Sequence, residues 1–381
     1  MKDSRHFRRK MTPPWHSRRG APRFRRMRAA TWLAAPLLAA LLLPLAIVPL
    51  RHGQPVPVAV PSATADPALP GTAAEEAAQP QVSVYLSQSG QIETLPLEDY
   101  VSGVIAAEMP ADFELEALKA QAVAARTFIV RRLLAGDVSG VPVPGADVTD
   151  TISHQAYVSA ATLEREWAHG GKSAELAKLR RAVMETRGII MTYKGQPITA
   201  SFFASSGGYT ENSEDYWNAA VPYLRSVASP WEKEITPNLA VTYTFSTSEL
   251  LSKLGVANTA IPAAKDISQS VKAQSVSSSS SGLTIELLSL TTGHRIKQIS
   301  IGGVLFTGRE VREKLGLRSS QFTWKRKGNE VFITTYGNGH GVGMSQWGAN
   351  GMAKEGSTAT RILKHYYSGI SFSQVSTLLK K

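Results

Sequence analysis

The sequence predicts an α+β fold with a helix-rich front part and a strand-rich back part. Apolar residues recur at helical spacing over 97–108 and 114–134. Alternating apolar and polar residues, which are typical of half-buried strands, dominate from 283 onward. Because hydrophobic residues make up 43% of the 381 residues, the chain can bury a sizeable core. Helices and strands that fall in separate runs favour α+β over an alternating α/β arrangement.

A basic tail and an apolar run precede the folded part. The first thirty residues carry eleven Lys or Arg and one Asp, so most of the net charge of +12 lies there. Residues 29–50 contain no charge and would span roughly 33 Å as a helix, close to the thickness of a bilayer core. We expect a single transmembrane helix at 29–50, with the tail 1–28 in the cytoplasm and everything after the helix outside.

A cleavable signal peptide is the alternative interpretation of the apolar run. The triplet Ala63–Ala65 resembles a cleavage site, but it lies far beyond the run, and the run is long for a signal peptide. Residues 51–80 are rich in Pro and Ala, which predicts an extended linker. The folded extracytoplasmic region is therefore expected to cover 81–381.

The remaining elements follow in order along this region. A strand is expected at QVSVYL, from 81, before the two helices, which are separated by Met109–Pro110. A further helix is expected over 172–186 and strands over 188–204. The Ser-rich segment 267–282 predicts a loop. The back part is expected to hold strands over 283–290, 294–306 and 329–336, a short helix near 308–315 and a final helix over 357–367.

The composition excludes several function classes. The chain has no Cys, which rules out thiol catalysis and thiolate metal sites. The basic charge suggests a nucleic-acid-binding protein, but its confinement to the tail argues against that class, and we expect no nucleic-acid partner. Histidines at 154, 169, 294, 340 and 365 occur singly, without HExxH or another ligand spacing, so we expect no metal and no cofactor. No GxSxG elbow is present.

Glu108 is the first candidate for catalysis. It continues the apolar stripe of the helix over 97–108, so its carboxyl is expected to be partly desolvated and to have a raised pKa. Pro110 disfavours helix at Met109, which places Glu108 at a helix end beside a loop or cleft. An acid of this kind can protonate the leaving oxygen of a glycosidic bond. A surface Glu, or one paired with a nearby Arg, is the alternative.

Arg126 interrupts the Ala-rich face of the next helix, together with Gln121. A buried Arg needs a carboxylate or a polar ligand. The pattern alone favours a structural salt bridge, with Glu108 as one candidate partner, over contact with a ligand.

Two Gly-containing segments have the composition of binding loops. ASSGGYT follows an apolar strand and contains Ser205, Ser206 and Tyr209. NGHGVGMSQWGANGMAKEG, from 338, surrounds His340 and Gln346 with glycines but contains no phosphate-binding fingerprint. Polar side chains in such a frame suit sugar hydroxyls. Tight structural turns are the alternative explanation of the glycines.

Six segments together resemble the SpoIID/LytB family. They are LPLEDYVSGVIAAEMP from 95, EALKAQAVAARTF from 116, VTDTISHQAY from 148, FFASSGGYTENSEDYW from 202, PYLRSV from 222 and GNGHGVGMSQWGANGMAKEG from 337. The resemblance covers most of residues 90–370. The basic tail, the apolar run and the linker fit the sporulation branch of the family.

The resemblance implies a lytic transglycosylase of the engulfment stage of sporulation. Such an enzyme cuts between N-acetylmuramic acid and N-acetylglucosamine in peptide-stripped strands and leaves 1,6-anhydro ends. It implies that Glu108 is the catalytic acid in a cleft of the helix-rich part and that Arg126 lies near the site. Ser205, Ser206, Tyr209, His340 and Gln346 are the candidates for sugar binding. The implied partners are glycan strands, a cell-wall amidase and a membrane protein of the same wall-degrading complex.

The chain departs from the pattern of some relatives at one point, and the family also includes a second function. Some relatives carry Cys and His near the position of His154 that can hold a metal, and this chain lacks the Cys. A non-catalytic wall-binding protein that activates an amidase is the alternative function, since relatives in the family have that role.

Overall fold

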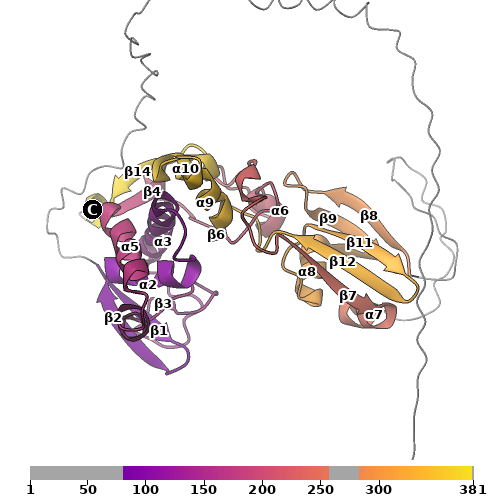
Figure 1. The fold of residues 1–381 in the computed structure, drawn as a ribbon, viewed down its shortest axis with the longest axis horizontal. Helices are drawn as coiled ribbons and strands as arrows, with labels where there is room; N and C mark the ends of the chain where they lie inside the picture. Colours follow the sequence, from indigo (N-terminus) through magenta and orange to yellow (C-terminus); the bar gives the residue numbers. More distant parts are fainter. Residues whose placement is uncertain (1–79, 257–282, 380–381) are drawn as a thin grey trace, which may run out of the picture. The chain divides into compact units, whose positions relative to one another are not determined.

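The computed structural model describes residues 80–256 and 283–379 (Figure 1). The predicted tail 1–28, the span 29–50, the Ser-rich segment 267–282 and all but the last residue of the linker lie outside these residues. Within the described part, no helix is both long and apolar enough to cross a bilayer. The α+β class predicted from the sequence is confirmed.

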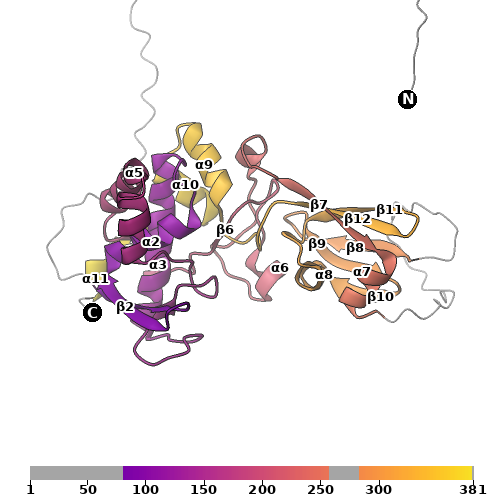
Figure 2. The same cartoon turned by 60° about the horizontal axis from the view of Figure 1, so that its bottom comes forward.

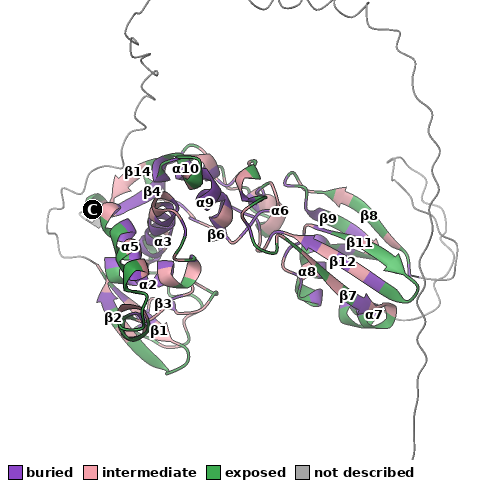
Figure 3. Cartoon of the chain, in the orientation of Figure 1, coloured by how far each residue is buried: buried purple, intermediate pink, exposed green. Residues whose placement is uncertain are grey.

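The described residues form two hydrophobic cores, which define two regions. We call residues 80–239 and 337–379 the helical region and residues 240–256 and 283–336 the strand region. Each region has its own set of buried apolar side chains. Figure 3 shows buried residues along α3 and β4 in the first and on alternate residues of β12 in the second.

The helical region is built around two long helices, α2 (Leu97–Glu108) and α3 (Leu115–Ala135), which pack with α5 (Ser173–Glu185). β1 (Gln81–Leu86) pairs with β2 (Gln91–Pro96) and with β3 (Val148–Thr149). The strand β1 and the helix α2 agree with the sequence prediction, whereas β2 was not predicted. Figure 2 shows these elements from a second side.

Local sequence sets the ends of both long helices. α2 ends at Glu108 because Met109, the residue before Pro110, is extended, with φ −120° and ψ 135°. α3 ends before Gly136, which takes the left-handed conformation with φ 59° that glycine adopts without strain. Both ends lie within one residue of the predicted ends.

The rest of the helical region consists of short elements. Three β pairings hold it together: β4 (Ile189–Tyr193) with β5 (Gln196–Pro197) and β14 (Ser371–Gln374), and β6 (Phe202–Phe203) with β13 (Met344–Ser345). The helices are α4 (Ala160–Thr162), η1 (Leu163–Ala168), α6 (Ser213–Trp217), η2 (Pro230–Glu232), α9 (Gln346–Lys354), α10 (Ala359–Tyr366) and α11 (Val375–Leu379).

The strand region contains two three-stranded sheets, ordered β10-β9-β8 and β11-β12-β7. Two helices, α7 (Thr247–Leu254) and α8 (Gly308–Leu315), belong to the same core. The strands are β7 (Ala240–Ser246), β8 (Ile285–Leu290), β9 (Ile296–Ile301), β10 (Val304–Thr307), β11 (Phe322–Lys327) and β12 (Glu330–Tyr336).

The two regions do not follow one another along the chain, as the predicted front and back parts would. The strand region is inserted into the helical region, because residues after β12 return to the first core through Met344, Ile362 and Tyr366. The strands β7 and β11 and the helix α9 were not predicted. α9 was read as part of a Gly-rich loop.

Candidate active site around Glu108

The carboxyl of Glu108 lies at the end of α2 and is half-buried, as the helical stripe predicted. Its Oε1 accepts a hydrogen bond from the backbone N–H of Ala156 at 3.1 Å. Its Oε2 accepts a longer one from the side-chain amide of Gln346 at 3.4 Å. The structure therefore brings together two of the predicted site residues, Glu108 and Gln346, and adds one backbone donor.

The pKa of Glu108 is raised, which agrees with the expected desolvation. Burial raises it, and the hydrogen bonds from Ala156 and Gln346 oppose that rise. No ion pair to Glu108 occurs in the described ranges, so the suggested pairing with an Arg is not seen there. The carboxyl can hold a proton and, once it has lost that proton, keeps two donors for its negative charge.

A glycine in α2 explains how Ala156 reaches the carboxyl. A Cβ at Gly103 would lie 2.3 Å from the ring of Tyr157, so only glycine lets this segment rest directly on the helix. The N–H of Val158 donates to the carbonyl oxygen of Gly103 at 3.1 Å. The ring of Tyr157 also stacks on Tyr100, with centroids 5.5 Å apart. These contacts place the Ala156 N–H over the last turn of α2.

Gln346 is positioned by the start of α9. β13 pairs in parallel with β6, and its last residue, Ser345, is the N-cap of α9. The Ser345 hydroxyl accepts a hydrogen bond from the N–H of Gly348 at 3.1 Å, as N-cap residues do. Gln346 is the first residue of the helix and is 5% exposed. Its side chain is therefore largely held in place by the fold.

The two predicted binding loops lie side by side. Ser205 and Asn338 exchange backbone hydrogen bonds, and the N–H of Glu211 donates to the carbonyl oxygen of Gly341 at 2.8 Å. Gly343 is required for the close approach, since its φ is +81° and a Cβ there would lie 2.0 Å from the carbonyl oxygen of Ser201. The glycines of the second loop thus serve backbone packing, which was the structural alternative.

The hydroxyl candidates in the first loop differ in exposure. Ser205 and Ser206 are buried, and the Ser206 hydroxyl donates to the carboxyl of Glu232. Tyr209 is 43% exposed, and its ring lies 4.7 Å from the ring of His294. Of these three side chains, only Tyr209 is open to a ligand in this conformation. Sugar binding by any of them stays a prediction.

His340 lies in an aromatic cluster. Its ring centroid is 5.5 Å from those of Phe203 and Tyr216 and 5.7 Å from that of Trp217. Burial, followed by the nearby Arg295 charge, lowers the pKa of His340 to about 3, so the imidazole is neutral at physiological pH. It borders a cavity of about 270 Å³ whose lining includes residues of α6, β9 and α8 together with Glu211 and Arg295. Glu108 does not line this cavity.

Arg126 is fully buried, and its partner is Glu98, not Glu108. Nε donates to both carboxylate oxygens at 3.1 Å, and Nη2 donates to Oε2 at 2.5 Å. The remaining donors reach Val183, Ile189 and Thr186. This geometry corresponds to the structural salt bridge considered as the alternative, with a different carboxylate. Contact between Arg126 and a substrate stays a prediction.

The described residues contain no cluster of three or more His, Asp or Glu side chains arranged to hold a metal ion. His154 has both ring nitrogens within hydrogen-bond distance of protein groups. Nδ1 faces Thr149 and Nε2 faces the carbonyl oxygen of Ser139 at 3.0 Å.

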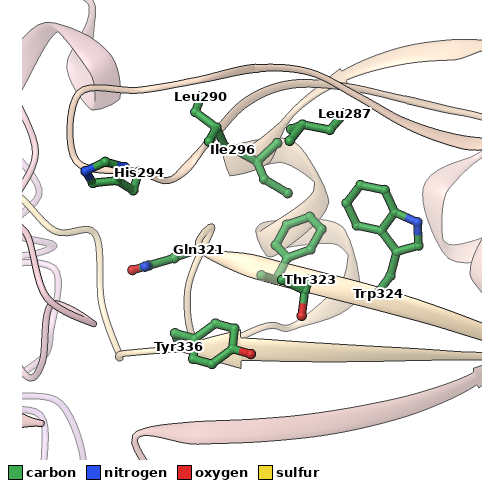
Figure 4. Close-up of a pocket in the computed structure, with 9 residues that line it drawn as sticks. Leu287, Leu290, His294, Ile296, Gln321, Thr323, Trp324 and Tyr336 are labelled. Atoms are coloured by element: carbon green, nitrogen blue, oxygen red, sulfur yellow. The ribbon is translucent and has the colours of Figure 1, made fainter. Parts of the chain in front are cut away.

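A groove of about 380 Å³ in the strand region contains none of the predicted site residues (Figure 4). It runs between the end strands β8 and β11, and it is mostly apolar. Its lining residues are Leu287, Leu290, His294, Ile296, Gln321, Phe322, Thr323, Trp324 and Tyr336.

Sequence reasoning missed the Ala156 donor, because a backbone group carries no residue signal. It also missed Glu232, which accepts the Ser206 hydroxyl, because a single carboxylate in a segment without periodicity gives no signal. Ser345 does have a sequence signal, because Ser is a preferred N-cap residue, but the glycines after it argue against a helix.

Comparison with known proteins gives concordant matches. A family model described as Stage II sporulation protein matches residues 85–193. The Stage II sporulation protein D of Bacillus amyloliquefaciens is 47% identical over 301 residues, which cover 79% of this chain and 80% of that protein. The Stage II sporulation protein D of Bacillus subtilis (strain 168) is 43% identical over 343 residues, which cover 88% of this chain and 93% of that protein. A protein named Amidase enhancer from the same strain is 32% identical over 310 residues, covering 72% and 40%.

Proposed function

This chain belongs to the SpoIID family of stage II sporulation proteins, and we propose that it is a peptidoglycan lytic transglycosylase. Its substrate would be glycan strands already stripped of stem peptides during engulfment. It would cut the bond between N-acetylmuramic acid and N-acetylglucosamine and leave 1,6-anhydro ends. The observation that carries the proposal is the half-buried carboxyl of Glu108, with its raised pKa and its two hydrogen-bond donors.

The reaction needs one carboxyl and no attacking water. Glu108 gives its proton to the glycosidic oxygen, the bond from that oxygen to C1 breaks, and positive charge develops at C1 of the muramic acid. The C6 hydroxyl of the same sugar then bonds to C1 and releases its proton to Glu108. Oε2, which has the longer hydrogen bond, is the oxygen that we assign to the proton. The Ala156 N–H stabilises the carboxylate between the two steps.

The basic tail and the apolar run support a location at the cell membrane. We propose a single span at 29–50 with the tail in the cytoplasm, which places residues 81–381 on the side of the cell wall. The Pro/Ala-rich linker would give that region reach towards the glycan strands.

Activation of a cell-wall amidase is the second candidate function. It is favoured by one observation, the match to a relative named Amidase enhancer. In that case the partners are the amidase and a membrane protein of the same complex, and Glu108 has no chemical role.

Incubation of the full chain in detergent micelles with peptide-free glycan strands, followed by mass spectrometry, tests both candidates. Anhydro-ended products are expected from the wild type. Glu108→Gln should reduce their rate of formation by a factor of about 100 to 10,000, because general acid catalysis is lost. Glu166→Gln, which changes an exposed Glu of the same region, is the matched control. Equal activity in Glu108→Gln would exclude this residue as the acid. Product from neither protein, with amidase stimulation intact, would favour the activator.

A further inference from the structure

Glu232, at the end of η2, is a buried carboxyl whose hydrogen-bond partners are all uncharged. It is 1% exposed. Oε2 accepts hydrogen bonds from the Ser206 N–H and the Ser345 hydroxyl, both at 2.9 Å, and Oε1 accepts one from the Ser206 hydroxyl. No ion pair to Glu232 occurs in the described part of the chain. Burial raises the pKa of this carboxyl, and hydrogen bonds from Ser206, Ser345 and Ser229 oppose the rise. A buried carboxyl without a cation needs such a set of donors.

The Glu232 carboxyl joins the two predicted binding loops. Ser206 belongs to the first loop, and Ser345 belongs to the second, where it caps α9. The Ser345 hydroxyl has one proton, and its nearer acceptor is the Glu232 carboxyl at 2.9 Å, whereas the carbonyl oxygen of Ala204 lies at 3.5 Å. The same hydroxyl accepts the N–H of Gly348 with a lone pair. Glu232 is therefore the stronger of the two acceptors that orient the cap. The next residue along the chain is Gln346, whose amide donates to Glu108.

The packing of η2 against α9 makes this linkage rigid. A Cβ at Gly351 would lie 2.5 Å from the side chain of Trp231, and one at Gly348 would lie 2.3 Å from the hydroxyl of Ser229, the N-cap of η2. These two glycines, three residues apart, form a small-residue face on which η2 and its N-cap rest. The turn that carries Glu232 therefore lies directly against the first turn of α9.

We propose that Glu232 is a positioning residue for Glu108, which acts by fixing the start of α9 and so the Gln346 amide that donates to the acid. This inference rests on the proposed function for its catalytic meaning, although the geometric linkage exists without it. Glu232 touches neither Glu108 nor the reacting atoms. It acts through two intermediates, Ser345 and Gln346. The positions of both depend on the Glu232 carboxylate as a hydrogen-bond acceptor, which the amide in Glu232→Gln reproduces only in part.

The test is the ionisation of Glu108 in the full chain, labelled with ¹³C-glutamate and held in detergent micelles. The signal of Glu108 is identified by its loss in Glu108→Gln. Because the Gln346 hydrogen bond lowers the pKa of Glu108, Gln346→Ala should move the titration midpoint to higher pH. Glu232→Gln should move it in the same direction, because its NH₂ group cannot accept the proton of Ser345. Glu234→Gln, an exposed Glu two residues later, is the control and should leave the midpoint in place.

A double-variant cycle separates positioning from general structural damage. Adding Glu232→Gln to Gln346→Ala should cause no further shift, since both act through the same hydrogen bond. Additive shifts, or an unchanged midpoint in Glu232→Gln, would overturn the proposal. If Glu232→Gln fails to fold, as judged by near-UV circular dichroism, Ser345→Ala removes the same linkage from the other side and should give the same shift.

Activity provides the second readout. Glu232→Gln should lower the rate of anhydro-product formation about tenfold, because a donor to the catalytic acid is displaced. The falling limb of the pH profile should move to higher pH together with the NMR midpoint. A wild type that forms no product would contradict the proposed function alone, because the midpoint shift is measured without any reaction.

Discussion

Arg126 and Arg295 are both buried almost completely, and each faces one glutamate, but the two pairs differ in geometry. Arg126 in the helical region binds Glu98 through Nε and Nη2, and Glu98 also accepts the N–H of Gly188. Arg295 in the strand region lies with Nε 3.6 Å from Glu211, beyond hydrogen-bond distance. Neither this Nε nor the second oxygen of Glu211 has a hydrogen-bond partner among the described residues.

In the second pair, the pKa values of both members are shifted from their ordinary values. Burial raises the pKa of Glu211 to about 7, and the Arg295 charge only partly opposes this. Burial also lowers the pKa of Arg295 to about 10. A desolvated ion pair is favourable only when its geometry satisfies both groups. The first pair meets this condition through the hydrogen bonds from Nε and Nη2, whereas the second contains a carboxyl with a pKa of about 7.

Arg126→Met should produce the largest loss of stability, because it leaves the Glu98 charge buried without its cation. We expect the free energy of unfolding to fall by about 3–5 kcal/mol, measured by denaturant titration of the full chain. Replacing both partners, as Arg126→Met with Glu98→Leu, should recover much of that loss. If Arg126 instead serves the substrate, the single variant would keep its stability and show a raised KM.

The second pair predicts a pH dependence of stability. The folded-state pKa of Glu211, about 7, lies above the unfolded value of about 4.3. The folded protein therefore retains a proton that the unfolded chain loses, so the contribution is complete below pH 4 and disappears as the pH rises through 7. We expect a loss of about 3 kcal/mol across this window. Unfolding measured between pH 4 and 8 should show a flatter profile for Glu211→Gln than for the wild type. Equal profiles would exclude Glu211 as the titrating group.

An exposed pair gives the smallest expected effect and serves as a reference. Arg181 and Glu185 are one helical turn apart on α5, with 65% of the Arg181 side chain exposed. Arg181→Met should change the free energy of unfolding by less than about 0.5 kcal/mol, because solvent and salt screen the pair. A loss comparable to that of Arg126→Met would mean that burial is not what distinguishes these pairs.

Local signals allowed much of the helical region to be predicted. Pro110 and the apolar stripe defined the end of α2, and Gly136 marks the end of α3. α9 was missed because helix propensity argues against its glycines, and their reason is tertiary: Trp231 and Tyr366 leave no room for a Cβ. Insertion of the strand region between two parts of one core leaves no local pattern, so it could not be predicted.

In the candidate site too, some features follow from local sequence and others depend on tertiary contacts. Glu108 could be found from its place on a helical stripe, and its raised pKa followed from the same pattern. The contact between Glu108 and Gln346 depends on a long return of the chain, which no spacing rule reports. Arg126 was correctly expected to be buried against a carboxylate, but the choice of Glu98 over Glu108 depends on the packing of α2, α3 and α5.

The hydrogen bonds to Glu108 also carry a consequence for biosynthesis. The Ala156 donor lies 48 residues after the acid, and the Gln346 donor lies 238 residues after it. Chains fold progressively from the N-terminus as they emerge. A nascent chain that has exposed Glu108 therefore still lacks the groups that tune its acidity. The complete acid environment assembles only after the strand region is present and α9 has docked, so the groups that tune this carboxyl come together late in folding.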